Sequence, residues 1–260
     1  MLYTYSVETL FLFIIGAIIG SFLNVAGLRF NSGLTLFGRS SCYHCGKKLS
    51  PTELVPILGF LFLKGRCAGC KAKISWQYPL IEIWTGLIFA TTYNLPFTIA
   101  HKVILLAVFS IYTVILIYDF RHKIIPDSLV YASTLLSLAI PLFIYEYLLI
   151  DWLSGPTLFS FFALIWLLSR GRAMGFGDAK LALSVGILLG ASAGFSAIIL
   201  AFWIGAVFGI ILLLKKPKDT TIKSGFQISL KSEIPFAPFI VLGAWLALIF
   251  NVDLLHVSLL

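Results

Sequence analysis

Charged residues are scarce in this chain of 260 residues. Only 12% of them are Asp, Glu, Lys or Arg, whereas 60% are hydrophobic and the mean hydropathy is +1.01. A soluble domain has about 25% charged and roughly 45–50% apolar residues, so this excess of apolar surface cannot be buried in a soluble core. The composition therefore excludes an ordinary soluble enzyme. It predicts an all-α membrane bundle that forms a single domain over residues 1–260.

Other common signals are also missing. The first apolar run, Leu10 to Leu28, has no basic segment before it and no small-residue cleavage site near its end. We therefore expect a retained span rather than a removed signal peptide. The chain has no internal repeat, and Gly175-x-Gly177 is too short for a phosphate-binding or dinucleotide-binding glycine loop.

Eight apolar runs lie between the polar breaks of the sequence. They cover residues 9–28, 79–95, 102–119, 127–146, 154–169, 179–194, 196–214 and 235–252. A span needs about 20 apolar residues, and the fifth and sixth runs are shorter than that. We therefore expect about eight transmembrane helices, with six or seven as the alternative.

Positive charge is confined to alternate loops. Of the 19 Lys and Arg residues, 18 lie in the loops after the first, third, fifth and seventh runs or, in the case of Lys180, at the very start of the run that follows such a loop. The other loops instead carry Glu8, Glu146, Asp151 and Asp253. By the positive-inside rule, this segregation predicts that both termini lie outside and that the basic loops lie in the cytosol. Topology thus explains the net charge of +8 without nucleic acid.

The only sizeable segment outside the apolar runs, residues 30–78, contains all the cysteines. They form two pairs about twenty residues apart, Cys42-x-x-Cys45 and Cys67-x-x-Cys70. This spacing is typical of a tetrahedral site in which four cysteines hold a structural Zn²⁺. In a reducing cytosol disulfides are disfavoured, so zinc is the main hypothesis. Two disulfides, or free thiols on the other side of the membrane, are the alternative.

Within the cysteine pairs, two further features are expected. Gly46 and Gly69 stand where the tight turns need small residues, and His44 is expected to be exposed rather than to act as a ligand.

Two carboxylates stand at the ends of apolar runs. Asp119 ends the third run, and Asp178 begins the sixth within Gly175-Phe176-Gly177-Asp178-Ala179-Lys180. The expected topology puts both at the cytosolic boundary, where a carboxylate is costly unless it is solvated, paired or used. Two neighbouring carboxylates cannot both ionise easily, so one keeps a proton. That arrangement allows peptide hydrolysis, because the ionised member takes a proton from water while the other polarises the carbonyl.

Each polar residue also has a structural interpretation. Asp178 and Asp127 could cap the helices that begin near them, and Asp119 could pair with a cation of the next loop. Lys180 could pair with an aspartate or contact a lipid phosphate. Glu82 could be a carboxylate at a helix end or a polar contact near the site.

Taken together, these residues resemble a known family, the bacterial type IV prepilin leader peptidases, which are GxGD membrane aspartyl proteases. The resemblance covers nearly the whole chain. Its blocks are Gly20-Ser21-Phe22-Leu23-Asn24-Val25, the two cysteine pairs followed by Ile74-Ser75 and Tyr78-Pro79-Leu80-Ile81-Glu82, Asp119 with Ile125-Pro126-Asp127, Gly175-Phe176-Gly177-Asp178-Ala179-Lys180-Leu181, and Ile234-Pro235-Phe236-Ala237-Pro238-Phe239.

The resemblance implies that Asp119 and Asp178 are the catalytic aspartates. They would remove the basic leader from prepilins or pseudopilins at the cytosolic face of the bacterial inner membrane. Family members with the cysteine loop also methylate the new N-terminal amine with S-adenosylmethionine, although the residues that would bind this cofactor are unknown here. Val55-Pro56 and His44 depart from the family pattern in that loop. The alternatives are a protease without methylation, a proton-coupled carrier, or a non-enzymatic assembly factor that docks through the zinc loop.

Overall fold

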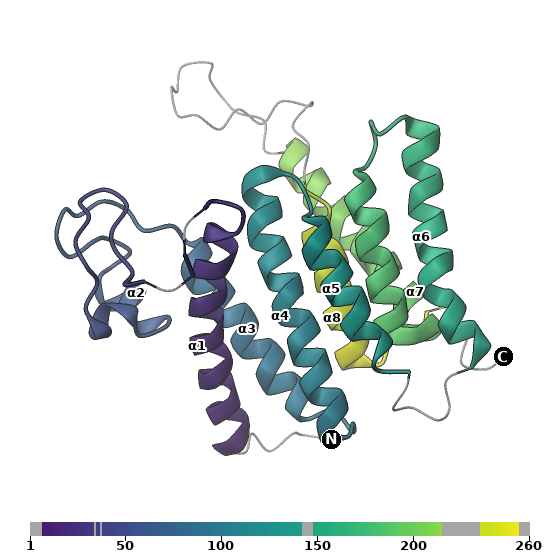
Figure 1. Cartoon of the computed structure of the whole chain (residues 1–260), viewed down its shortest axis with the longest axis horizontal. Coiled ribbons are helices and arrows are strands. Elements are labelled where there is room, and N and C mark those ends of the chain that lie inside the picture. Colours follow the sequence, from purple (N-terminus) through teal and green to yellow (C-terminus); the bar gives the residue numbers. More distant parts are fainter. Residues whose placement is uncertain (1–6, 34, 37, 142–147, 215–234, 255–260) are drawn as a thin grey trace. The chain divides into compact units, whose positions relative to one another are not determined.

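The computed structural model describes residues 7–33, 35–36, 38–141, 148–214 and 235–254 (Figure 1). Over these residues the secondary structure is helical, without strands, apart from two isolated β-bridges in the cysteine segment. The predicted all-α class is therefore confirmed. The basic loop after the seventh run, in residues 215–234, and Glu146 lie outside the described residues.

Within the described residues, each predicted apolar run overlaps a helix. The helices are α1 (Val7–Arg29), α3 (Gln77–Tyr93), α4 (Ile99–His122), α5 (Asp127–Leu138), α6 (Leu149–Ser169), α7 (Phe176–Leu214) and α8 (Ala237–Phe250), with the short η1 (Pro51–Leu54) and α2 (Leu58–Phe62) between α1 and α3. By length and composition, α1, α4, α6 and α7 can cross a membrane, and α8 is a shorter apolar helix. The chain is thus a membrane protein, but the predicted count of about eight spans is not confirmed.

Helix α7 is broken at Gly190, which has φ 73° and ψ −172°. Only glycine adopts this conformation readily. The chain folds back there, because a Cβ added to Gly194 would lie 3.3 Å from the Cα atom of Gly186. The two halves of α7 therefore correspond to the sixth and seventh predicted runs. The break comes a few residues earlier than the sequence indicated.

The chain divides into two compact units, up to Tyr118 and from Asp119 onward, so the last turn of α4 belongs to the second unit. In the first unit α1 packs against α3 through small residues. A Cβ on Gly16 would lie 2.6 Å from the carbonyl oxygen of Thr85. Such close backbone contact is how transmembrane helices associate without a hydrophobic driving force.

In the second unit α7 packs against α5, α6 and α8 (Figure 1). The contact with α6 is close, because a Cβ on Gly186 would lie 2.6 Å from the Cα atom of Gly155. The hydroxyl of Ser154 also donates a hydrogen bond to the carbonyl oxygen of Gly186, at 2.8 Å. The start of α7, which carries Asp178, thus belongs to a helix held by three others. The single-domain organisation stays a prediction.

Candidate active site and candidate metal centre

Asp119 lies in the last turn of α4. The helix ends at His122 because Lys123 takes a left-handed backbone conformation and its N–H donates to the carbonyl oxygen of Asp119, at 2.8 Å. The residue is only 4% exposed, and its Oδ2 atom has no hydrogen-bond partner among the described residues. Leaving a buried polar atom unsatisfied is costly, so such an atom calls for an explanation such as a functional role.

Asp178 is the third residue of α7, which begins at Phe176. It is therefore not the N-cap of that helix. Its backbone N–H donates to the carbonyl oxygen of Gly175 at 3.2 Å, and the residue is 7% exposed. Gly177 has a packing role that the sequence did not indicate, because a Cβ there would lie 2.8 Å from the Cβ of Ile125. The start of α7 can thus approach the link that follows α4.

The two aspartates lie near one another in the second unit. The negative charge of Asp119 acts on the carboxylate of Asp178, and both side chains are buried. Two carboxylates that lie close together in a buried site can share one proton. The catalytic role of the two residues stays a prediction.

Asp127 and Lys180 form an ion pair beside these aspartates, with 2.7 Å between Nζ and Oδ1. Pro126 is the N-cap of α5 and Asp127 is its first residue, so the interpretation of Asp127 as the cap was wrong. The ammonium group also lies 5.7 Å from the ring centre of Tyr131 and 5.2 Å from that of Phe176, within the range of cation–π attraction. This pair joins the first turn of α5 to the first turns of α7.

Glu82 is buried in the second turn of α3, in the first unit. Its Oε2 atom accepts a hydrogen bond from the backbone N–H of Ile57, at 2.7 Å. Ile57 directly precedes α2, so this carboxylate fixes the start of α2 against α3.

The four cysteine sulfurs converge, with every pair of them within 4.8 Å. The sulfurs of Cys42 and Cys70 are 3.8 Å apart, and those of Cys45 and Cys67 are 4.0 Å apart. Sulfurs at about 2.3 Å from a tetrahedral zinc ion would lie about 3.8 Å from one another, so the donor set fits Zn²⁺. All four thiols are free, which does not agree with the disulfide alternative.

The two cysteine pairs fold alike. The N–H of Cys42 donates to the carbonyl oxygen of Lys47, and that of Cys67 donates to Ala72, both at 2.9 Å. In the first pair the left-handed turn residue is Gly46, as expected.

In the second pair the matching position is Lys71, with φ 60°, and not Gly69. The expectation for Gly69 as a turn residue was therefore wrong. A Cβ on Gly69 would lie 3.7 Å from the sulfur of Cys45, so its small size instead suits the contact between the two pairs. His44 is exposed, as expected.

Backbone hydrogen bonds favour the thiolate at one end of the cluster. The N–H groups of Cys45 and His44 lower the pKa of Cys42 to about 6. The N–H of Ala72 also lowers the pKa of Cys70, but desolvation and the neighbouring sulfurs outweigh it and raise that pKa to about 11. Four thiolates therefore do not gather here unless a cation balances them, as a metal ion does.

The comparisons with known proteins all point to the same family. Residues 14–95 match the bacterial peptidase A24 N-terminal domain, and residues 104–210 match the type IV leader peptidase family. The chain is 32% identical to a prepilin leader peptidase/N-methyltransferase of Bacillus subtilis over 92% of its own length and 93% of that protein. It is 30% identical to the protein of the same name from Stutzerimonas stutzeri, over 92% and 89% of the two chains. No solved structure matches significantly. On this evidence the chain belongs to the type IV leader peptidase family.

Proposed function

We propose that this chain is a membrane aspartyl endopeptidase that removes the leader peptide from type IV prepilins or pseudopilins. The observation that carries the proposal is the pair of buried aspartates, Asp119 and Asp178, in one compact unit. The names of the relatives support the same activity. A proton-coupled carrier would need acids near the middle of its spans, whereas Asp119 and Asp178 lie at helix ends.

In the proposed mechanism the two aspartates share one proton. The ionised carboxylate takes a proton from a water molecule as that water attacks the scissile carbonyl carbon. The protonated carboxyl donates a hydrogen bond to the carbonyl oxygen and stabilises the developing negative charge. Neither a nucleophilic side chain nor a metal ion takes part in this step. The unpartnered Oδ2 atom of Asp119 is available to a water or to the substrate.

The substrate suits a site at the inner face of the membrane. A prepilin has a basic leader followed by an apolar helix, so the helix can lie in the bilayer while the junction reaches the cytosolic boundary. Basic residues flank both aspartates, at Arg121 and Lys123 after the first and at Arg170 and Arg172 before the second. By the positive-inside rule, these basic residues support a site that faces the cytosol of the bacterial cell.

The names of the relatives support a second activity. The chain also methylates the new N-terminal amine, for which S-adenosylmethionine would supply the methyl group. Cys42, Cys45, Cys67 and Cys70 would hold a structural Zn²⁺, since four protein ligands leave no open position for catalysis. The metal would then fix the segment between α1 and α3.

Replacing each aspartate by asparagine tests the peptidase assignment. Asp119→Asn and Asp178→Asn each remove the shared proton, so cleavage of a prepilin should fall by about 10²–10⁴-fold. The matched control is Asp253→Asn, which changes a carboxylate beyond α8 and should cleave normally. Thermal unfolding and membrane insertion are measured for all three variants. Normal processing by either active-site variant would remove that residue from the mechanism.

Incubation with a prepilin and labelled S-adenosylmethionine tests the two activities separately. We expect leader removal and labelling of the shortened product, with no label on the uncleaved precursor because its amine is not yet exposed. Cleavage without label would leave a protease that lacks methylation. Neither cleavage nor label, in protein that is folded, would contradict the proposed function as a whole.

A further inference from the structure

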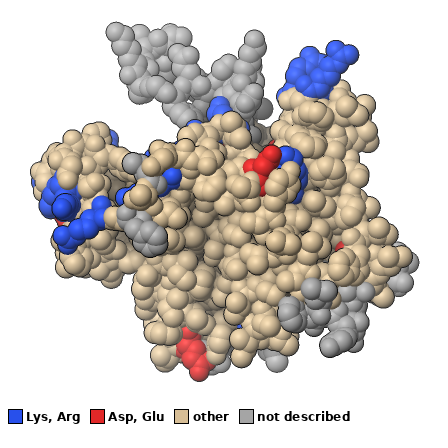
Figure 2. Space-filling model, viewed as in Figure 1, with Lys and Arg blue, Asp and Glu red and all other residues tan. Residues whose placement is uncertain are grey.

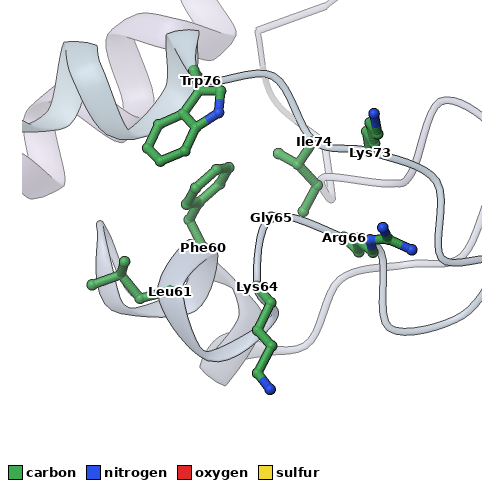
Figure 3. Close-up of a pocket in the computed structure, with 8 residues that line it drawn as sticks. All are labelled: Phe60, Leu61, Lys64, Gly65, Arg66, Lys73, Ile74 and Trp76. Atoms are coloured by element: carbon green, nitrogen blue, oxygen red, sulfur yellow. The ribbon is translucent and has the colours of Figure 1, made fainter.

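A cavity of about 550 Å³ opens in the first unit, between α2 and the start of α3 (Figure 3). No sequence pattern predicted it, because its walls come from separate parts of residues 60–76. Its lining residues are Phe60, Leu61, Lys64, Gly65, Arg66, Lys73, Ile74 and Trp76. None of them belongs to the cysteine ligands or to the aspartate pair.

The inner wall of this pocket is apolar and aromatic. The rings of Phe60 and Trp76 are in contact, with centroids 4.8 Å apart and planes inclined by 56°. Ile74 points towards Phe60 across the pocket (Figure 3). Trp76 remains 67% exposed although it touches Phe60. An aromatic side chain left this open, directly before α3, is typical of the boundary between lipid and water.

The outer rim of the pocket is basic. Arg66 and Lys73 stand opposite one another in an antiparallel bridge, and their charges lie at the same end of the pocket (Figure 3). Like charges in directly opposed positions destabilise a bridge, so the fold itself does not explain the pair. Lys64 adds a third cation, and none of the three forms an ion pair with a carboxylate in the part of the chain that the structure describes. No acidic residue lines the pocket, which therefore favours an anion.

The pocket lies beside the start of α3. The bond from the Ile57 N–H to Glu82 holds the start of α2 beside the second turn of α3. The residues that follow turn apolar side chains outward, since Leu58, Leu61 and Phe62 are all exposed and Phe62 is 79% exposed. Apolar side chains exposed next to basic residues are the pattern of a segment that lies in the interface of a bilayer. Figure 2 shows Lys and Arg gathered over this segment, whereas most of the helical surface in view carries no charge.

We propose that this pocket binds the phosphate headgroup of an anionic phospholipid and that α2 lies in the same leaflet. The phosphate oxygens accept hydrogen bonds from Arg66 and Lys73, while the acyl chains run along Trp76 and the exposed side chains of α2. S-adenosylmethionine suits the pocket poorly, because its net positive charge opposes three unpaired cations. The inference does not depend on the peptidase or methyltransferase assignment.

The test uses the full-length protein in detergent, with phosphatidylglycerol, phosphatidylcholine, inorganic phosphate and S-adenosylmethionine as separate probes. Native mass spectrometry measures how many lipids stay bound. Phosphatidylglycerol should be retained in preference to phosphatidylcholine. Each basic residue near a membrane surface contributes about 1 kcal/mol, so Lys73→Gln should weaken binding about five-fold and the double variant with Arg66→Gln about 25-fold.

A matched control lies in the other cysteine pair. Lys48 forms an isolated β-bridge with Ser41, in the same way as Lys73 does with Arg66. Lys48 does not line the pocket. Lys48→Gln should therefore leave lipid binding unchanged. Phe62→Ser, at a position too exposed to disturb packing, should reduce retention of both lipids. Bound zinc, measured in every variant, shows that the segment is still folded.

Four outcomes would overturn the proposal. Equal retention of the two lipids, or equal losses with Lys48→Gln and Lys73→Gln, would leave no specific headgroup site. If inorganic phosphate binds the pocket as well as phosphatidylglycerol does, the pocket would be a site for a soluble anion. Loss of S-adenosylmethionine binding in Lys73→Gln, with lipid binding intact, would make it the cofactor pocket instead.

Discussion

Lys71 holds a backbone conformation that costs energy. Its φ is 60°, at the same turn position that glycine occupies in the other cysteine pair. A residue with a side chain destabilises the folded state by about 1 kcal/mol when its backbone is left-handed. Glycine avoids this cost, but its greater conformational freedom in the unfolded chain offsets part of the gain. Lys71→Gly should therefore raise the affinity for zinc up to about five-fold. Competition with a metal chelator measures this change, starting from protein with about one zinc per chain.

The reverse change in the first pair is the control. A Cβ on Gly46 would meet no other atom within 4 Å, so Gly46→Ala changes the backbone preference and no contact. It should weaken zinc binding by about the amount that Lys71→Gly gains. Purified protein without metal, in which all four thiols of the native state react with an alkylating reagent, would refute the zinc site itself.

The sequence predicts some residues of the sites better than others. The cysteines and the two aspartates could be named because motif spacing and position at the ends of apolar runs identify them. The partner of Lys180 and the packing of Gly177 on Ile125 could not, because they depend on how α5 and the link after α4 approach α7. Local sequence carries no record of such approaches.

The break in α7 depends on a carboxylate from another helix. Asp151, in the first turn of α6, accepts the N–H of Ala191 at 2.9 Å with Oδ1 and the N–H of Leu148 at 3.2 Å with Oδ2. It thus satisfies amide groups at the start of α6 and at the start of the second half of α7. Each such cap contributes about 1 kcal/mol, so Asp151→Ala should lower the free energy of unfolding by about 2 kcal/mol.

Thermal unfolding in detergent measures this loss. Asp151→Asn keeps one acceptor oxygen and should lose about half as much, which separates the caps from the charge. If Asp151→Ala unfolds like the unchanged protein, the carboxylate does not hold the break. The sequence predicted Asp151 only as part of an acidic outer loop, and it put the break of α7 a few residues too late because it runs apolar on both sides of Gly190.

Contacts inside the second unit divide its helix ends into two groups. At one end, Asp127 meets Lys180 and the charge of Asp119 acts on Asp178. The other end holds the contact of Asp151 with Ala191. There the N–H of Leu254 also donates to the hydroxyl of Ser196, at 3.0 Å. The first group has basic loops beside it and the second has acidic ones, so the segregation of charge seen in the sequence agrees with the packing of this unit.

Fusions of a reporter that is active only outside the cytosol test this arrangement across the whole molecule. Attached after residue 36 or residue 171, the reporter should be inactive, because basic loops stay in the cytosol. Attached after residue 254, it should be active, because the contacts of Asp151 and Ser196 put the break of α7 and the end of α8 on the same side. Each half of α7 must then cross the membrane, although the first, Phe176 to Gly190, spans only about 22 Å. An inactive reporter at residue 254 together with an active one near Asp151 would show an odd number of crossings between them, and α7 would then cross only once.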